Sequence, residues 1–192
     1  MKLVVAEFVT VDGVVQAPGA PDEDTERGFK HGGWSVDHMD DHIRLNTELF
    51  QTVDAFLIGR GTYDAWVEYW PNVTDETDEI AKALNTKPKY VASTTLENPR
   101  WAGTTVIRDV PTEVAQLKTK PGRPVLVVAS PKLIQTLTAE ALVDEYQLWI
   151  HPVVVGGVGK RLFENDNPLT KLQLVDSRTT GSGLVILTYA RA

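Results

Sequence analysis

The stretch 54–64 constrains the fold of this chain more than any other part of the sequence. It begins with a short apolar run typical of a buried strand, continues through a Gly-Arg-Gly turn at 59–61, and is followed by Thr62, which is placed to open a helix. A strand, a tight turn and a helix in this order aim free backbone N–H groups at one point. The sequence therefore predicts either an anion site, with phosphate as the natural ligand, or a tight turn whose Arg60 points into solvent.

The rest of the chain alternates between strand and helix patterns. The last three strands follow one another without a convincing helix, so they should pair partly antiparallel, whereas the earlier strands suit a parallel sheet. These patterns predict an α/β fold with a mixed, mostly parallel central sheet and an antiparallel C-terminal part. We expect strands at 2–9, 54–58, 89–93, 103–107, 124–129, 146–155, 171–177 and 184–189, and helices at 37–52, 62–66, 75–84, 112–118 and 130–137.

A second strand end resembles the first in its chemistry. The run 124–129 is a fully buried strand pattern, and Ser130 and Pro131 after it are expected to be the N-cap and the first residue of a helix. The carboxyl ends of parallel strands share one edge of a sheet, so this helix start would face the same phosphate as the turn at 59–62. Two such ends side by side favour a dinucleotide.

Composition limits the classes of partner. The 192 residues suit one domain, 1–192, and the net charge of -7 argues against nucleic acid, which needs a basic face. No apolar run approaches the ~20 residues of a membrane span. The absence of cysteine fits a reducing cytoplasm. His38 and His42 have the spacing of half a metal site, but Met39 replaces the glutamate of a metalloprotease helix, so we expect an exposed helix face and no metal.

Two acidic residues near the N-terminus are candidate catalytic groups. Glu7 interrupts an apolar strand, and a carboxyl buried there would have a raised pKa or a specific partner, which suits a proton donor or a substrate anchor. The alternative is a Glu7 on the solvent side of an edge strand. Asp12 either binds substrate or caps the turn at Gly13. The run 16–33 that follows is a long irregular loop, which in a compact domain is usually functional or mobile.

Five motifs stand in order along the chain: Phe8–Gly13, Ile58–Tyr63, Val91–Thr94, His151–Gly156 and Gly159–Phe163. Taken together, they resemble the dihydrofolate reductase fold. More specifically, they resemble the bacterial dihydrofolate-reductase-like proteins that share a domain with the reductase half of the bifunctional riboflavin-biosynthesis deaminase/reductase. The resemblance covers nearly the whole chain and implies a three-layer α/β/α domain.

The resemblance implies that the cofactor is NADPH. It assigns the pyrophosphate to the turn at 59–62, with the helix start after Ala129 on the other side, and it places Ser93 and Thr94 near the adenosine 2′-phosphate. Relatives usually carry consecutive glycines where this chain has Ala129-Ser130-Pro131, and here the proline lacks an N–H donor. The residues assigned to the cofactor are Val15, Gly59, Arg60, Gly61, Thr62, Ser93, Thr94, Ala129, Ser130, Lys132 and Leu133.

The resemblance also implies a place for the substrate. The end of the first strand should border the nicotinamide, and the loop and helix between His31 and Asp41 should wall the substrate side. Glu7 and Asp12 remain the candidate catalytic residues. The candidate substrate contacts are Phe8, His31, Trp34, Asp37 and Asp41.

Together these features imply an NADPH-dependent reductase that transfers a hydride to a small pteridine- or pyrimidine-like heterocycle. Such an enzyme would resemble 5-amino-6-(5-phosphoribosylamino)uracil reductase and dihydrofolate reductase. The alternative is a non-catalytic NADP(H)- or nucleotide-binding protein on the same fold, which the departure at Ala129-Ser130-Pro131 favours. Reductases of this sort are commonly dimeric, so a homodimer is expected.

Overall fold

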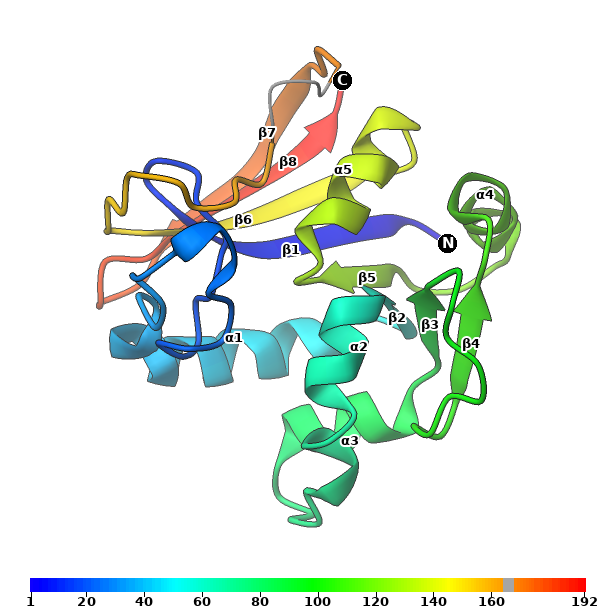
Figure 1. Ribbon diagram of the computed structural model, residues 1–192. Coiled ribbons are helices and arrows are strands. Elements are labelled where there is room, and N and C mark those ends of the chain that lie inside the picture. The colour runs from blue at the N-terminus through cyan, green and yellow to red at the C-terminus, as the bar shows by residue number, and fades with distance from the viewer. Residues whose placement is uncertain (164–167) are drawn as a thin grey trace.

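One β-sheet organises the protein (Figure 1). The computed structural model describes residues 1–163 and 168–192, and within these ranges the eight strands have the order β4-β3-β2-β5-β1-β6-β8-β7. Neighbours from β4 to β6 run parallel, while β8 is antiparallel to both β6 and β7. The predicted mixed sheet is confirmed. The strands are Leu3–Thr10 (β1), Ala55–Gly59 (β2), Lys89–Ala92 (β3), Thr104–Ile107 (β4), Val125–Val128 (β5), Glu145–His151 (β6), Leu172–Thr179 (β7) and Val185–Arg191 (β8).

Helices cover both faces of the sheet because side chains alternate along each strand. Phe56 of β2 belongs to a core cluster with residues of α1, α2 and α3, whereas its neighbour Leu57 belongs to a second cluster with residues of α4 and α5. This is the expected α/β/α arrangement. The helices are Met39–Gln51 (α1), Arg60–Trp66 (α2), Glu79–Thr86 (α3), Val110–Thr119 (α4) and Pro131–Ala139 (α5). None in the described ranges is long and apolar enough to cross a membrane.

The two turns singled out in the sequence lie next to each other. β2 and β5 are parallel neighbours, so their carboxyl ends reach the same edge of the sheet. The chain passes from β2 directly into α2, and from β5 through Ala129 and Ser130 into α5. The carboxyl ends of β4, β3 and β1 reach the same edge. Five strands that are neighbours in the sheet, from β4 to β1, therefore place the loops that follow them on one side of the molecule.

Some boundaries differ from those expected. The strand predicted at 146–155 ends at His151, where the N–H of Val153 turns back to the His151 carbonyl at 2.7 Å. The helix expected to open at Thr62 begins at Arg60, so Thr62 lies within its first turn. Short helices tolerate such shifts because tertiary packing overrides local propensity.

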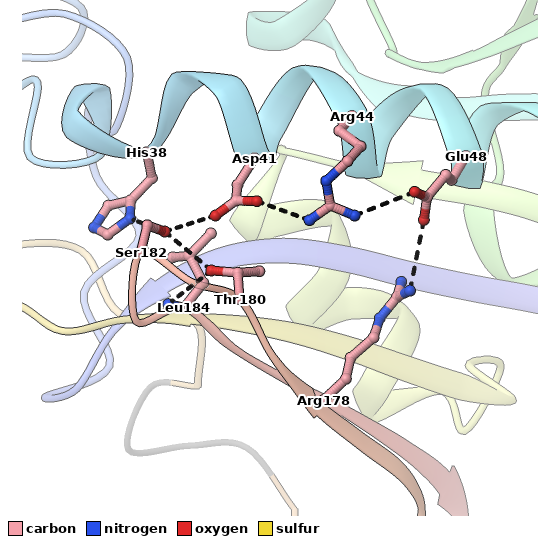
Figure 2. A network of polar contacts seen from close by, with 8 residues as sticks. All are labelled: His38, Asp41, Arg44, Glu48, Arg178, Thr180, Ser182 and Leu184. Carbon is pink, nitrogen blue, oxygen red and sulfur yellow. Dashed lines mark hydrogen bonds and ion pairs between the residues drawn. The ribbon is translucent and has the colours of Figure 1, made fainter.

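A series of polar contacts joins α1 to the hairpin of β7 and β8 (Figure 2). The Ser182 hydroxyl donates to the Asp41 carboxylate at 2.6 Å and bonds to Nδ1 of His38 at 2.8 Å. The contacts then continue along the helix from Asp41 and return to β7. The series runs His38, Ser182, Asp41, Arg44, Glu48 and Arg178. It fastens the antiparallel end of the sheet to α1.

The helix α3 begins later than the sequence suggested. We expected it from Asp75, but it starts at Glu79 because the Asp78 carboxylate accepts from the N–H groups of Ile80 and Ala81, at 3.0 and 2.9 Å. A side-chain acceptor in this position fixes where a helix starts.

We expect Asp78→Ala to lower the free energy of unfolding by about 1 kcal/mol, because two N–H groups at the start of α3 lose their acceptor. Equilibrium unfolding in urea measures the change. Glu76→Ala, in the exposed segment before the helix, is the control and should stay within about 0.5 kcal/mol of wild type. Equal losses in both variants would contradict the capping role.

Candidate functional site

A cleft of about 790 Å³ runs along the carboxyl ends of the parallel strands, and its volume falls within the range usual for small-molecule sites. Residues that follow β4, β3, β2 and β5 line it, and Glu7 and the loop after β1 complete it. Five strands at the usual spacing extend over about 19 Å, which is long enough for an extended dinucleotide. Every residue that the resemblance assigned to NADPH lines this one cleft.

The end of the cleft beside β3 and β4 is cationic. Arg108, directly after β4, donates from Nη1 to the Ser93 carbonyl at 2.8 Å. Arg60 lines the same end and donates to the Thr95 hydroxyl at 3.3 Å, while its Nε pairs with Asp64 at 2.8 Å. Arg60 is therefore neither buried nor free in solvent. Two guanidinium groups beside a turn rich in hydroxyls suit a phosphate group.

Ser130 lines the middle of the cleft and joins the ends of β5 and β2. Its Oγ accepts from the N–H of Gly59 at 2.8 Å and shares a hydrogen bond of 2.7 Å with the Thr62 hydroxyl. Ser130 and Pro131 are the N-cap and the first residue of α5, as expected, but the Ser130 side chain makes no capping bond, because its hydroxyl is engaged with β2 and α2 instead. The Gly59 N–H and the Thr62 hydroxyl are thus already engaged within the protein.

The backbone between β5 and α5 has a left-handed conformation, which glycine adopts most readily. Ala129 and Ser130 have φ angles of 49° and 70°, in the left-handed region, which costs a residue with a Cβ about 1 kcal/mol. The consecutive glycines expected from the resemblance would adopt this form without strain. A Cβ added at Gly59 would approach the Ser130 Cβ to 3.3 Å, so the two strand ends are packed closely.

Glu7 lies at the opposite end of the cleft from the arginines, and the alternative of a solvent-facing Glu7 is wrong. β1 is a central strand between β5 and β6, and Glu7 is only 5% exposed. Its Oε2 is buried without a hydrogen-bond partner. Burial, and then the negative charge of Glu23, raise the pKa of Glu7 from 4.5 to about 8. The carboxyl is therefore mostly protonated at neutral pH.

The loop at 16–33 forms the wall beside Glu7, and buried Gln16 organises it. The Gln16 amide donates to the carbonyls of Asp24 and Glu26, both at 3.1 Å, and its Oε1 accepts from the N–H of Lys160 at 3.0 Å. The ammonium group of Lys160 pairs with the same two acids at 2.6 and 2.7 Å. These contacts anchor the middle of the loop to the segment after β6.

Asp12 lies outside the cleft. Its carboxylate accepts from the Thr10 hydroxyl at 2.7 Å and from the N–H groups of Val155 and Gly156 at 3.2 and 2.8 Å. These hydrogen bonds, led by that of Thr10, lower the pKa of Asp12 to about 2. Within the turn the Asp12 carboxylate bonds only to the Thr10 hydroxyl, while the Gly13 N–H donates to the Thr10 carbonyl at 2.9 Å, so Asp12 mainly holds the segment after β6 against the turn.

The structure separates Phe8 from Glu7, because adjacent residues of a strand point to opposite faces. Phe8 faces α1, where it stacks on His42 and Trp149 with ring centroids 4.2 and 5.1 Å apart. The expected exposed face for His42 is wrong: it is buried, and its Nε2 contacts Nε2 of His151 at 2.8 Å. Burial lowers the pKa of both histidines to about 4, so the pair is neutral at physiological pH.

The other candidate substrate contacts also lie apart from the cleft wall. Trp34 donates from Nε1 to the Gln16 carbonyl at 2.7 Å and so supports the loop from behind. His31 and Asp37 are exposed, and Asp41 belongs to the contacts between α1 and the hairpin. No cluster of three or more metal-ligating side chains occurs in the part of the chain that the structure describes.

The cleft residues that were not anticipated from the sequence include Gln16, Arg108 and Lys160. A basic residue directly after a strand of the parallel set was a usable signal for Arg108, because that position falls on the ligand-binding edge of the sheet. Gln16 and Lys160 meet across 144 residues, and no local pattern marks such a pair.

Comparison with known proteins agrees with this geometry. The fold and its cleft define the dihydrofolate-reductase-like class of α/β proteins. The model of the RibD C-terminal domain matches residues 1–186, and the chain belongs to that family. The uncharacterized protein YyaP of Bacillus subtilis (strain 168) is 35% identical over 190 residues, which cover 98% of this chain and 94% of that protein.

Two solved structures share the fold. A putative riboflavin biosynthesis protein from Shewanella sp. PV-4 superposes with a TM-score of 0.68 at 20% identity, over 100% of this chain and 99% of that one. A pyrimidine reductase-like protein from Corynebacterium diphtheriae superposes with a TM-score of 0.57 at 12% identity, over 100% and 92% of the two chains.

We expect Glu7→Gln to flatten the pH dependence of stability. The pKa of Glu7 is about 8 in the folded protein and lies near 4.5 when unfolded, so its contribution is complete below pH 4.5 and is lost as pH rises through 8. Wild type should therefore lose stability relative to the variant between pH 5 and 9, by on the order of several kcal/mol. Urea unfolding at a series of pH values measures this. Parallel profiles for the two proteins would refute it, and Glu76→Gln should keep the wild-type profile.

Proposed function

We propose that the protein is an NADPH-dependent reductase that transfers a hydride to a small heterocyclic substrate of the pteridine or pyrimidine type. The observation that carries the proposal is the cleft itself, which crosses five strand ends with arginines at one end and a buried carboxyl at the other. Family membership and the pyrimidine reductase-like neighbour support the same activity.

The residues present fit the charge and the length of this cofactor. Arg108 flanks the turn that holds Ser93 and Thr94, and it would neutralise the adenosine 2′-phosphate. Arg60, in the turn at 59–62, would bind the pyrophosphate. Thr62 and the exposed Lys132 of α5 lie nearer the middle of the sheet and would contact the pyrophosphate. Gly61 leaves open space, since a Cβ added there would meet no atom within 4 Å.

Bound NADPH supplies the hydride, so the chain itself must orient the two reactants, exclude water and manage a proton. Val15 and the loop around Gln16 would enclose the reacting end. Glu7 lies beside them with its carboxyl mostly protonated at neutral pH, and it can hold a proton at Oε2, which has no other partner.

One observation favours the alternative of a non-catalytic nucleotide-binding protein. The Ser130 hydroxyl takes the N–H of Gly59, a donor that a pyrophosphate would otherwise use. NADPH oxidation distinguishes the two proposals: turnover with any reducible pterin or pyrimidine supports the reductase, whereas tight NADPH binding without turnover across such a panel supports the alternative.

We expect calorimetric titration to give micromolar binding of NADPH and weaker binding of NADH. Arg60→Ala and Thr62→Ala should weaken the binding of NADPH and of NADH alike, because each of these nucleotides carries the pyrophosphate. Arg108→Ala should weaken NADPH about tenfold and change NADH little, since only NADPH carries the 2′-phosphate. Failure of the wild-type protein to bind either nucleotide would refute the cofactor assignment.

We expect Ser130→Ala to tighten NADPH binding several-fold, because the Gly59 N–H and the Thr62 hydroxyl become free for the ligand. Glu76→Ala, in the exposed segment before α3, is the control. It leaves the cleft and the Ser130 contacts in place and should not change affinity. Weaker binding by Ser130→Ala would instead make Ser130 a direct contact of the phosphates.

A further inference from the structure

Glu7 is an unusual part of the cleft wall because one of its polar atoms has no partner. Among the described residues, the buried side-chain atoms without a hydrogen bond are Oε2 of Glu7, Oγ1 of Thr104 and Nε1 of Trp149. Of these three residues, only Glu7 lines the cleft. A buried oxygen without a partner is unfavourable, so a contact that appears only with ligand accounts for it best.

The charged groups around Glu7 limit what that ligand contact can be. The loop at 16–33 brings Glu23, Asp24 and Glu26 to this end, α5 contributes Lys132, and the segment after β6 contributes Lys160. The Lys160 ammonium is already paired with Asp24 and Glu26, at 2.6 and 2.7 Å. Glu23, whose carboxylate accepts from the N–H groups of Gly19 and Ala20, adds a like charge beside Glu7. The surroundings therefore favour an uncharged Glu7.

We propose that Glu7, as a neutral acid, recognises an amide edge of the bound ligand, meaning a carbonyl beside an N–H or NH₂ group. A carboxylic acid offers one O–H donor and one oxygen acceptor in the same plane, and an amide offers the complementary pair. Two parallel hydrogen bonds then join the groups without bringing a charge into the buried end. This inference rests on the proposed function, because either reactant of that reaction carries such an edge.

Two sources supply this chemistry. One is the carboxamide of the nicotinamide ring, and the other is a ring lactam of a pyrimidine- or pteridine-like substrate. A cationic ligand would behave in the opposite way, since it would bind the ionised carboxylate and bind more tightly as pH rises. The sign of the pH dependence therefore separates amide recognition from cation recognition.

Calorimetric titration of the whole protein at pH 7 and pH 9 tests the proposal with three probes. NADPH carries the carboxamide, adenosine 2′,5′-bisphosphate carries phosphates without it, and 5,6-dihydrouracil is a lactam that stays neutral across this range. If only the acid form of Glu7 binds an amide edge, affinity for that probe falls about tenfold from pH 7 to pH 9. Affinity for the bisphosphate should not change. Binding of the amide probe at pH 8, compared across buffers of different ionisation enthalpy, should take up about half a proton.

Variants at position 7 separate recognition from folding. Glu7→Gln keeps a donor and an acceptor, so it should bind the amide probe at pH 7 and show no pH dependence. Glu7→Leu should bind it, at both pH values, about tenfold more weakly than the wild type does at pH 7. It should bind the bisphosphate normally, which also shows that the variant is folded. Glu76→Gln, in the exposed segment before α3, is the control and should keep the wild-type pH profile.

The outcomes separate this inference from the proposed function. If the affinity for NADPH falls as pH rises, the nicotinamide carboxamide is the amide edge that Glu7 binds. If only the affinity for dihydrouracil falls, that edge belongs to the substrate. If the bisphosphate binds while both amide probes are insensitive to pH and to Glu7→Leu, the inference is wrong and the cofactor site stands. If no nucleotide binds but dihydrouracil shows the fall, the inference stands and the cofactor assignment does not. Affinity that rises with pH, or no binding by any probe, overturns the inference.

Discussion

The central position of β1 is the constraint on which the cleft depends. β1 pairs in parallel with β5 on one side and with β6 on the other, so neither edge of the strand is open to solvent. Its pleat sends Leu3, Val5 and Val9 into the core beneath α4 and α5, and Glu7 must follow the same face. A one-residue shift in register would exchange Glu7 with Phe8. The chemistry at the end of the cleft is therefore fixed by the apolar residues of the strand.

At the junction between β5 and α5 the backbone keeps a left-handed conformation although neither residue there is glycine. Ala129 and Ser130 both adopt left-handed φ angles, which glycine would adopt at no cost. The strain is offset locally, since the Ser130 hydroxyl bonds to Gly59 and Thr62 at 2.8 and 2.7 Å. The consequence is a site whose central donors are preorganised but already in use. A ligand anion must compete with Ser130 for them, and its affinity then depends more on the flanking cations.

Sequence reasoning succeeded where the signal was local and periodic. The strand ends at 59–62 and 129–133 could be placed on one edge because parallel strands share their polarity, and every residue assigned there lines the cleft. It failed for His42, because whether a polar helix residue is buried depends on its partner His151, which lies 109 residues away. It also missed Gln16, since a buried amide that organises a loop leaves no pattern in the sequence around it.

The distribution of charge explains how an acidic protein can offer a site for an anionic ligand. Charges separated by more than about 8 Å at physiological ionic strength are largely screened, so the net charge of -7 matters less than the groups on the cleft wall. Arg60 and Arg108 make one end positive. At the other end Lys160 compensates two loop acids, and protonation removes the charge of Glu7. A cleft that is cationic at one end and nearly neutral at the other complements a molecule with phosphates on one side and an uncharged ring on the other.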